Sequence, residues 1–179
     1  MSSASHIVVV TGASGAGKTA IVGELAARAL PRMQCFHFDS IGVPSAEVMQ
    51  AEFGGGEKWQ AVATTEWVRR LGELPEETRV AILDGQTRPS FVFAAATASR
   101  RAVHVVLLDC DPETRATRLR GPRGQPELAT AQMDAWAAYL RAQADALQVP
   151  VIDTSSLSVD EAADKLANIV RRLCDGTIL

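Results

Sequence analysis

The chain has 179 residues, a formal net charge of −3 and an isoelectric point near 5.6. This charge balance provides no general basic field for a polyanion, so it argues against nucleic acid as a partner. Hydrophobic residues make up 47% and charged residues 22% of the chain, which excludes a disordered or fibrous protein. One domain of this length can bury a core of its own.

The cysteines and the apolar runs indicate where the protein works. Cys35, Cys110 and Cys174 are scattered, odd in number and without C-x-x-C spacing. Reduced thiols fit this pattern better than disulfides or zinc ligands. No apolar run approaches the length of a membrane span, and residues 1–6 lack the features of a secretion signal. We therefore expect a cytoplasmic protein without membrane contact, and the oligomeric state stays open.

Strands and helices are expected to alternate along the chain. Apolar runs predict strands at residues 7–10, 34–38, 79–83, 102–108 and 149–152. Helical spacing predicts helices at residues 18–30, 58–71, 89–101, 112–119, 127–147 and 158–173. Ser45 is expected to begin a short helix that glycines at 54–56 interrupt, and Ser158 to cap the last helix. Five alternations predict a three-layer α/β fold in one domain, with a five-stranded parallel sheet between helices.

The most specific motif is G-x-x-x-x-G-K-[ST], which directly follows the first predicted strand. It comprises Gly12, Ala13, Ser14, Gly15, Ala16, Gly17, Lys18 and Thr19, here called the phosphate loop. Glycines let such a loop bend around a phosphate so that successive backbone N–H groups point inward, and the next helix adds its positive end. Lys18 is expected to reach the β- and γ-phosphates and the Thr19 hydroxyl to bind Mg²⁺. The alternative is a chance Gly-rich turn, but the strand before it and the helix after it favour nucleotide binding.

Acidic residues end several predicted strands. Asp39, Asp84 and Asp109 lie there, and ligands of open α/β sheets bind beyond the carboxyl ends of the strands. Asp84 is a candidate for holding Mg²⁺ directly or through water, the alternative being a turn-forming Asp-Gly. Asp39 can take or orient a hydroxyl proton, or simply cap a turn. His37 shares the face of Asp39 by strand alternation, which makes it either a site residue or a packed one.

The order of these segments resembles the P-loop small-molecule kinases, and the resemblance covers nearly the whole chain. That group includes nucleoside monophosphate, shikimate, gluconate and adenylylsulfate kinases and chloramphenicol phosphotransferase. Leu83-Asp84-Gly85-Gln86-Thr87-Arg88 is similar to the L-D-G-x-x-R segment of adenylate-type kinases. The resemblance implies that Arg88 grips the acceptor, with Gln86 beside it. Gln86-Thr87 stands where that segment usually has Phe-Pro, which bears on whether the gripped group is a phosphate.

The resemblance also implies two mobile or inserted parts. Residues 40–78 would form a helical insertion that binds the acceptor, although the tryptophans there fit ordinary core packing better. Residues 119–127 would form a short lid. Arg118 and Arg123 would then stabilise the transferred phosphoryl group, with Arg118 also on the nucleotide, the alternative being a solvated basic loop.

Taken together, these features imply an ATP- and Mg²⁺-dependent phosphotransferase that acts on a hydroxyl of a small molecule. Asp39 and Arg88 in one cleft would suit a hydroxyl acceptor with a polar or anionic group for the arginine. A nucleoside monophosphate kinase is the close alternative. A nucleotide-sensing module, in which turnover is incidental, is the alternative from a different class.

Overall fold

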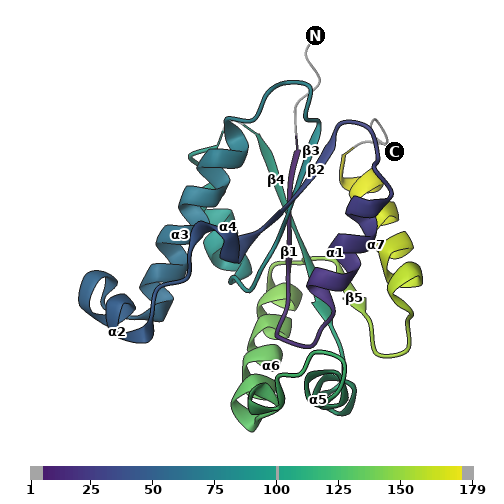
Figure 1. The fold of residues 1–179 in the computed structure, drawn as a ribbon. Coiled ribbons are helices and arrows are strands. Elements are labelled where there is room, and N and C mark those ends of the chain that lie inside the picture. Colours follow the sequence, from purple (N-terminus) through teal and green to yellow (C-terminus); the bar gives the residue numbers. More distant parts are fainter. Residues whose placement is uncertain (1–5, 100, 175–179) are drawn as a thin grey trace.

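A computed structural model describes residues 6–99 and 101–174 of the chain. Five parallel strands form one sheet in the order β2-β3-β1-β4-β5, and helices cover both of its faces (Figure 1). The predicted three-layer α/β fold is therefore confirmed. The strands are β1 (His6–Thr11), β2 (Met33–His37), β3 (Val80–Asp84), β4 (Ala102–Asp109) and β5 (Val151–Asp153).

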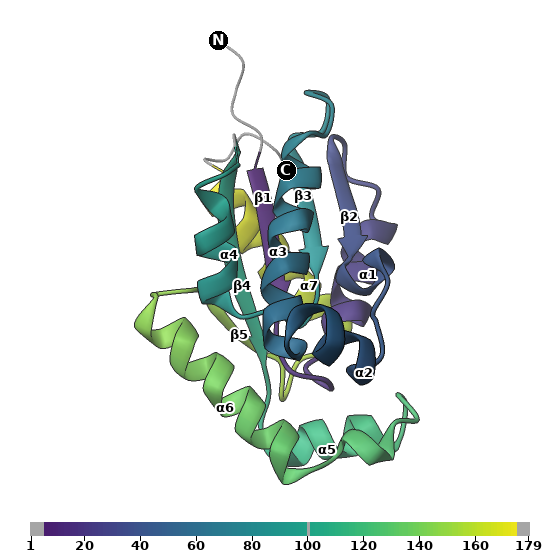
Figure 2. The ribbon, with the colours of Figure 1, turned by 90° about the vertical axis from the view of Figure 1, so that its left-hand side faces the viewer.

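Two layers of helices enclose the sheet. Helices α1 and α7 cover one face and α3 and α4 the other, with α6 beyond α4 (Figures 1 and 2). The helices are α1 (Lys18–Ala27), α2 (Ala46–Val48), α3 (Gly56–Gly72), α4 (Pro89–Ala96), α5 (Pro112–Arg120), α6 (Ala131–Ala146) and α7 (Val159–Leu173). Three single turns complete the order: η1 (Phe38–Ile41) and η3 (Pro126–Leu128) are 3-10 turns and η2 (Met49–Phe53) is a π turn.

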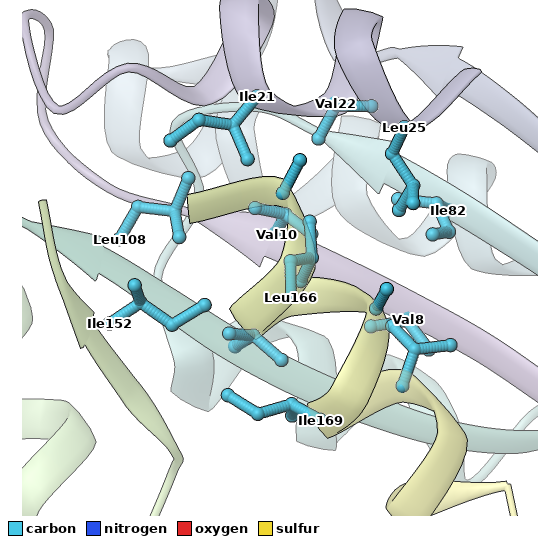
Figure 3. Close-up of a cluster of buried hydrophobic side chains, with 14 of the residues drawn as sticks. Val8, Val10, Ile21, Val22, Leu25, Ile82, Leu108, Ile152, Leu166 and Ile169 are labelled. Atoms are coloured by element: carbon cyan, nitrogen blue, oxygen red, sulfur yellow. The ribbon is translucent and has the colours of Figure 1, made fainter. Parts of the chain in front are cut away.

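The central strand β1 explains why the first apolar run does not alternate with polar residues. Val8 and Val10 point into the core under α1 and α7, while Ile7 and Val9 point into the core under α3 and α4. Both faces of a central parallel strand are covered, so each of its side chains gains by being apolar. Figure 3 shows the first of these cores, where Leu166 of α7 meets Val10 and neighbouring side chains.

Hydroxyl side chains set several helix boundaries. Ser45 and Ser158 accept hydrogen bonds from the first turns of α2 and α7, as expected. The helix predicted from residue 127 begins only at Ala131, because Thr130 caps it by accepting from the Met133 N–H. The helix predicted to reach residue 101 ends at Ala96, where the Thr97 hydroxyl bonds a backbone carbonyl one turn earlier.

The end of β2 also differs from the prediction. The strand stops at His37, and Phe38 and Asp39 belong to the 3-10 turn η1. The strand alternation expected to place His37 and Asp39 on one face therefore does not extend to Asp39, because a 3-10 turn brings round successive side chains three to a turn.

Two further findings concern membrane-spanning helices and disulfide bonds. Among residues 6–99 and 101–174, no helix combines the length and the apolar character needed to cross a membrane. All three cysteines lie within these ranges, and none of them is part of a disulfide.

Candidate functional site

The phosphate loop connects β1 to α1 at the carboxyl end of the sheet. A Cβ on Gly12 would lie 2.3 Å from the Leu108 carbonyl oxygen, so only glycine lets the loop pass β4 this closely. Gly17 is the N-cap of α1 with a φ of 95°, in the left-handed region that favours glycine. These two glycines aim the N-terminus of α1 back across the loop, which is the geometry of an anion-binding nest.

Lys18 lies at the centre of the loop's charges. It is the first residue of α1, and its Nζ donates to the Ala13 carbonyl oxygen at 3.0 Å across the loop. Burial lowers the pKa of Lys18 to about 8, a shift that Asp84 and Asp39 oppose and that Arg123 adds to. The structure thus brings three of the charged residues proposed from the sequence, Asp39, Asp84 and Arg123, within electrostatic range of Lys18.

Asp84 ends β3 beside the end of β2. Its side chain is buried, and its Oδ2 lies 3.0 Å from the Nδ1 of His37, with which it is paired in the sheet register. Burial raises the pKa of Asp84, while His37 and Lys18 act in the opposite direction. His37 is therefore held by a carboxylate at the site rather than packed in the core.

Two oxygen donors are available for a metal near the loop. Thr19 lies in the first turn of α1 on the wall of a cavity, and Asp84 is the last residue of β3. Mg²⁺ typically takes one or two protein oxygens and fills its remaining positions with water and phosphate oxygens. The Thr19 hydroxyl and the Asp84 carboxylate are oxygen ligands of the kind that such an ion accepts. Among the described residues, no cluster of three or more His, Cys, Asp or Glu side chains could hold a metal.

A cavity of about 580 Å³ lies between the phosphate loop and the start of α7, and we call it the α7 cavity. Arg118 forms part of its wall and is fixed there: Nη1 donates to the Thr154 hydroxyl at 2.9 Å and to the Gly15 carbonyl at 3.3 Å. Apolar side chains line much of the remainder, so a flat, weakly polar ring fits beside the guanidinium plane. These side chains are Ile21, Leu157, Val159 and Ala162.

Two further arginines of this region differ in their surroundings: Arg123 lies on the cavity wall and Arg115 is buried. Arg123 lines the α7 cavity and donates to Gln125 at 2.5 Å. Arg115 is buried and bonds Asp134 at 2.7 Å and Asp109 at 3.3 Å. The Arg115 side chain lies against Gly15 of the phosphate loop. Asp109 is one of the two carboxylates that pair with Arg115. Of the three acids predicted at strand ends, Asp39 and Asp84 interact electrostatically with Lys18, whereas Asp109 pairs with the buried Arg115.

A second cavity, of about 660 Å³, lies between α3 and α6, and we call it the α6 cavity. Gln86 connects it to the phosphate loop: Nε2 donates to the Ser14 hydroxyl at 2.6 Å, and Oε1 accepts from the indole N–H of Trp136 at 2.9 Å. The Gln60 amide also donates to the Gln86 carbonyl at 2.9 Å. The predicted site residue Gln86 therefore links the phosphate loop to the wall of the α6 cavity.

Arg88 lies inside the α6 cavity among partners that the sequence did not identify. Its Nη1 donates to Gln60 at 2.7 Å, and its Nη2 lies 3.1 Å from a carboxylate oxygen of Glu57. Its guanidinium carbon lies 4.9 Å from the centroid of the Trp136 ring and 5.6 Å from that of Tyr139. The signal available in the sequence was spacing: Glu57 and Gln60, like Trp136 and Tyr139, are three residues apart and share a helix face.

The tryptophans near the predicted insertion behave as core residues, as expected. Trp67 is buried and donates from its indole N–H to the Phe38 carbonyl at 2.9 Å. Trp59 packs edge-on against the Phe38 ring. Helix α3 thus anchors η1, the turn that carries Asp39.

The chain shares its α/β fold with solved structures of small-molecule kinases. A shikimate kinase from Acinetobacter baumannii in complex with shikimate matches with a TM-score of 0.63 at 18% identity, covering 96% of this chain and 95% of that one. A thymidylate kinase from Candida albicans matches with a TM-score of 0.66 at 12% identity, covering 98% and 95%. A tunicamycin resistance protein from Deinococcus radiodurans gives 0.66 at 20% identity, covering 93% and 95%. No family model and no curated protein matches the sequence.

The pKa of Lys18 predicts how nucleotide affinity depends on pH. Phosphates bind the ammonium form, and burial has lowered the pKa to about 8, so the binding form is lost as the pH rises through that value. The dissociation constant for ADP should rise roughly tenfold between about pH 7 and about pH 9. Calorimetric titration checks this. The Lys18→Arg variant is the control, since its guanidinium stays protonated and its profile should be flat. An ADP dissociation constant that does not change with pH in the unaltered protein would contradict the assignment of Lys18 to the phosphates.

Proposed function

We propose that the protein is an ATP- and Mg²⁺-dependent phosphotransferase that moves the γ-phosphoryl group to a hydroxyl of a small molecule. The observation that carries this proposal is the position of the phosphate loop between two cavities, with Gln86 bonded to both the loop and the wall of the α6 cavity. A kinase needs this arrangement, since the donor and the acceptor must meet at the γ-phosphate.

The nucleotide is assigned to the phosphate loop and the α7 cavity. The adenine ring would lie beside Arg118, and Lys18 would neutralise the β- and γ-phosphates. Arg123 would add positive charge where the transferred group becomes more negative. Thr19 and Asp84 would hold the magnesium ion, which supplies further charge neutralisation on the phosphates.

The acceptor is assigned to the α6 cavity and to the surface in front of η1. Its hydroxyl oxygen attacks the γ-phosphorus, the bond from that phosphorus to the β-γ bridging oxygen breaks, and ADP leaves. The hydroxyl proton passes to the Asp39 carboxylate, and His37 beside Asp84 helps to position the acceptor. Gln86 and Arg88 shape the remainder of the acceptor site. The helical insertion at residues 40–78 contributes Glu57 and Gln60, which bond Arg88 and the Gln86 backbone.

Nucleoside monophosphate kinase activity is the second candidate, because a thymidylate kinase is among the similar structures. A small-molecule hydroxyl is favoured because Asp39 would repel an anionic acceptor, whereas a hydroxyl gains from a carboxylate. We place the reaction in the cytoplasm, with no nucleic acid as partner.

The test is a screen for ADP formation from MgATP with sugar acids, polyols, hydroxylated ring compounds and nucleoside monophosphates. The proposal expects a hydroxylated compound to stimulate ADP formation and to appear as its phosphate ester. Stimulation by nucleoside monophosphates alone would favour the second candidate. Tight nucleotide binding without any stimulated product would favour a nucleotide-sensing module instead.

The segment at residues 119–127 is proposed to act as a lid. It is held by backbone turns, and its Arg123 reaches the α7 cavity, so bound phosphates would give that side chain a charged partner in addition to Gln125. We expect amide hydrogen exchange in this segment to slow severalfold with a non-hydrolysable ATP analogue and Mg²⁺. Exchange in α7 around Leu166, deep in the core, serves as the internal reference. Exchange rates in residues 119–127 that are the same with and without the nucleotide would argue against a lid.

A further inference from the structure

The α6 cavity carries an excess of negative charge. Its charged lining residues are Glu57, Glu127 and Arg88, which gives the lining a formal net charge of −1. Glu57 and Glu127 come from different segments, at the start of α3 and in η3, so they approach the cavity from two sides. An anion entering this cavity would meet two carboxylates for every guanidinium.

Both terminal nitrogens of Arg88 are already bonded within the protein, whereas its buried Nε has no hydrogen-bond partner among the described residues. One of its terminal nitrogens donates to Gln60 at 2.7 Å and the other pairs with Glu57 at 3.1 Å. Only 15% of the Arg88 side chain is exposed. An arginine that clamps an anion needs its forked donors directed at that ligand, and here both arms of the fork are bonded to α3.

Aromatic rings take up much of the remaining surface around the guanidinium. The rings of Trp136 and Tyr139 stack at a centroid separation of 5.6 Å and an angle of 17°, and the guanidinium carbon of Arg88 lies 5.1 Å from the centroid of the Phe91 ring. Gln86 fixes the Trp136 ring through its indole N–H, and it also bonds Ser14 of the phosphate loop. A flat ligand ring that packs on this aromatic wall would lie beside Gln86, which is bonded to the phosphate loop.

We propose that the acceptor is a neutral or cationic compound in which a planar ring accompanies the reacting hydroxyl. The proposal rests on the proposed function and narrows its acceptor. Arg88 then supports the aromatic wall through cation–π contacts, and the two glutamates favour a positive group and disfavour a carboxylate or phosphate. This differs from the sequence-based expectation that Arg88 holds an anionic group of the acceptor.

The test uses three probes that share one phenol ring: tyrosol, which is neutral, tyramine, which is cationic, and para-hydroxyphenylacetate, which is anionic. Binding is measured by ligand-observed NMR and by quenching of tryptophan fluorescence, with a non-hydrolysable ATP analogue and Mg²⁺ present. We expect tyrosol and tyramine to bind severalfold more tightly than the anion. Equal or tighter binding of the anion, or no binding of tyrosol and tyramine, would overturn the proposal.

A charge variant separates electrostatics from shape. Glu57→Gln keeps the size of the side chain and removes its charge, so it should narrow the preference for tyramine over the anion by roughly fivefold. Glu73→Gln is the matched control, because Glu73 is the C-cap of the same helix, pairs with Arg69 and is similarly exposed, at 65% against 67%. An unchanged preference in Glu57→Gln, or an equal change in Glu73→Gln, would overturn the proposal.

Binding and turnover separate this inference from the proposed function. If the probes bind in the expected order but no hydroxylated ring compound supports ADP formation, the function fails and the cavity assignment stands. If an anionic acceptor is phosphorylated efficiently, the function stands and this inference fails.

Discussion

Replacing Lys18 by alanine is expected to lower ATP turnover about 100- to 1,000-fold. The variant removes the ammonium group that lies among Asp84, Asp39 and Arg123 at the proposed γ-phosphate position. The fold should be unaffected, because the Lys18 side chain donates to one loop carbonyl and alanine is the best helix former for the first turn of α1. ADP formation with the most active acceptor of the screen gives the effect, and thermal unfolding checks the fold.

Lys165→Ala provides the matched control for this experiment. Lys165 is exposed on α7, so its loss should leave both turnover and unfolding temperature nearly unchanged. Turnover near the normal rate in Lys18→Ala would exclude the phosphate loop as the site of reaction.

Asp39→Asn is expected to lower phosphorylation of a hydroxyl acceptor about 100-fold or more. The amide keeps the shape of the side chain but cannot take the hydroxyl proton. Asp39 is exposed in η1, so the substitution removes no buried contact. The effect should appear mainly in kcat, because the proton moves only as the new bond forms.

Two comparisons make this variant informative. Asp145→Asn changes an exposed aspartate that pairs with Arg141 on α6, and it should have little effect. A nucleoside monophosphate is already anionic and needs no base, so its phosphorylation should be insensitive to Asp39→Asn. Robust phosphorylation of a nucleoside monophosphate, scarcely altered by Asp39→Asn, would replace the proposed reaction with the nucleotide-kinase alternative.

The sheet and the phosphate loop were predictable because local sequence determines them. Strand β1 is buried on both faces, so its continuous apolar run identifies it as a central parallel strand. The loop needs glycine where it passes Leu108 and where α1 begins, so the motif spacing carries its geometry. Asp84 could be placed at the site because parallel strands all end at one edge of the sheet.

The partners of the site residues were not predictable in the same way, because they depend on contacts between distant segments. Arg88 meets Glu57 from 31 positions earlier and the Trp136 ring from far later in the chain. Asp109 ends a strand, as Asp84 does, yet Asp109 forms an ion pair with the buried Arg115. No periodicity or motif encodes such pairings, which decide whether a charged side chain faces a ligand or the protein.

The most direct measurement follows the γ-phosphoryl group itself. The protein is incubated with MgATP whose γ-phosphoryl carries heavy oxygen, together with a mixture of hydroxylated small molecules, and the products are identified by mass spectrometry. The proposed reaction predicts a labelled phosphate ester of a small molecule, formed in amounts equal to the ADP and lost in Lys18→Ala. Label that remains in ATP, or that appears only in inorganic phosphate whatever compounds are present, would contradict it.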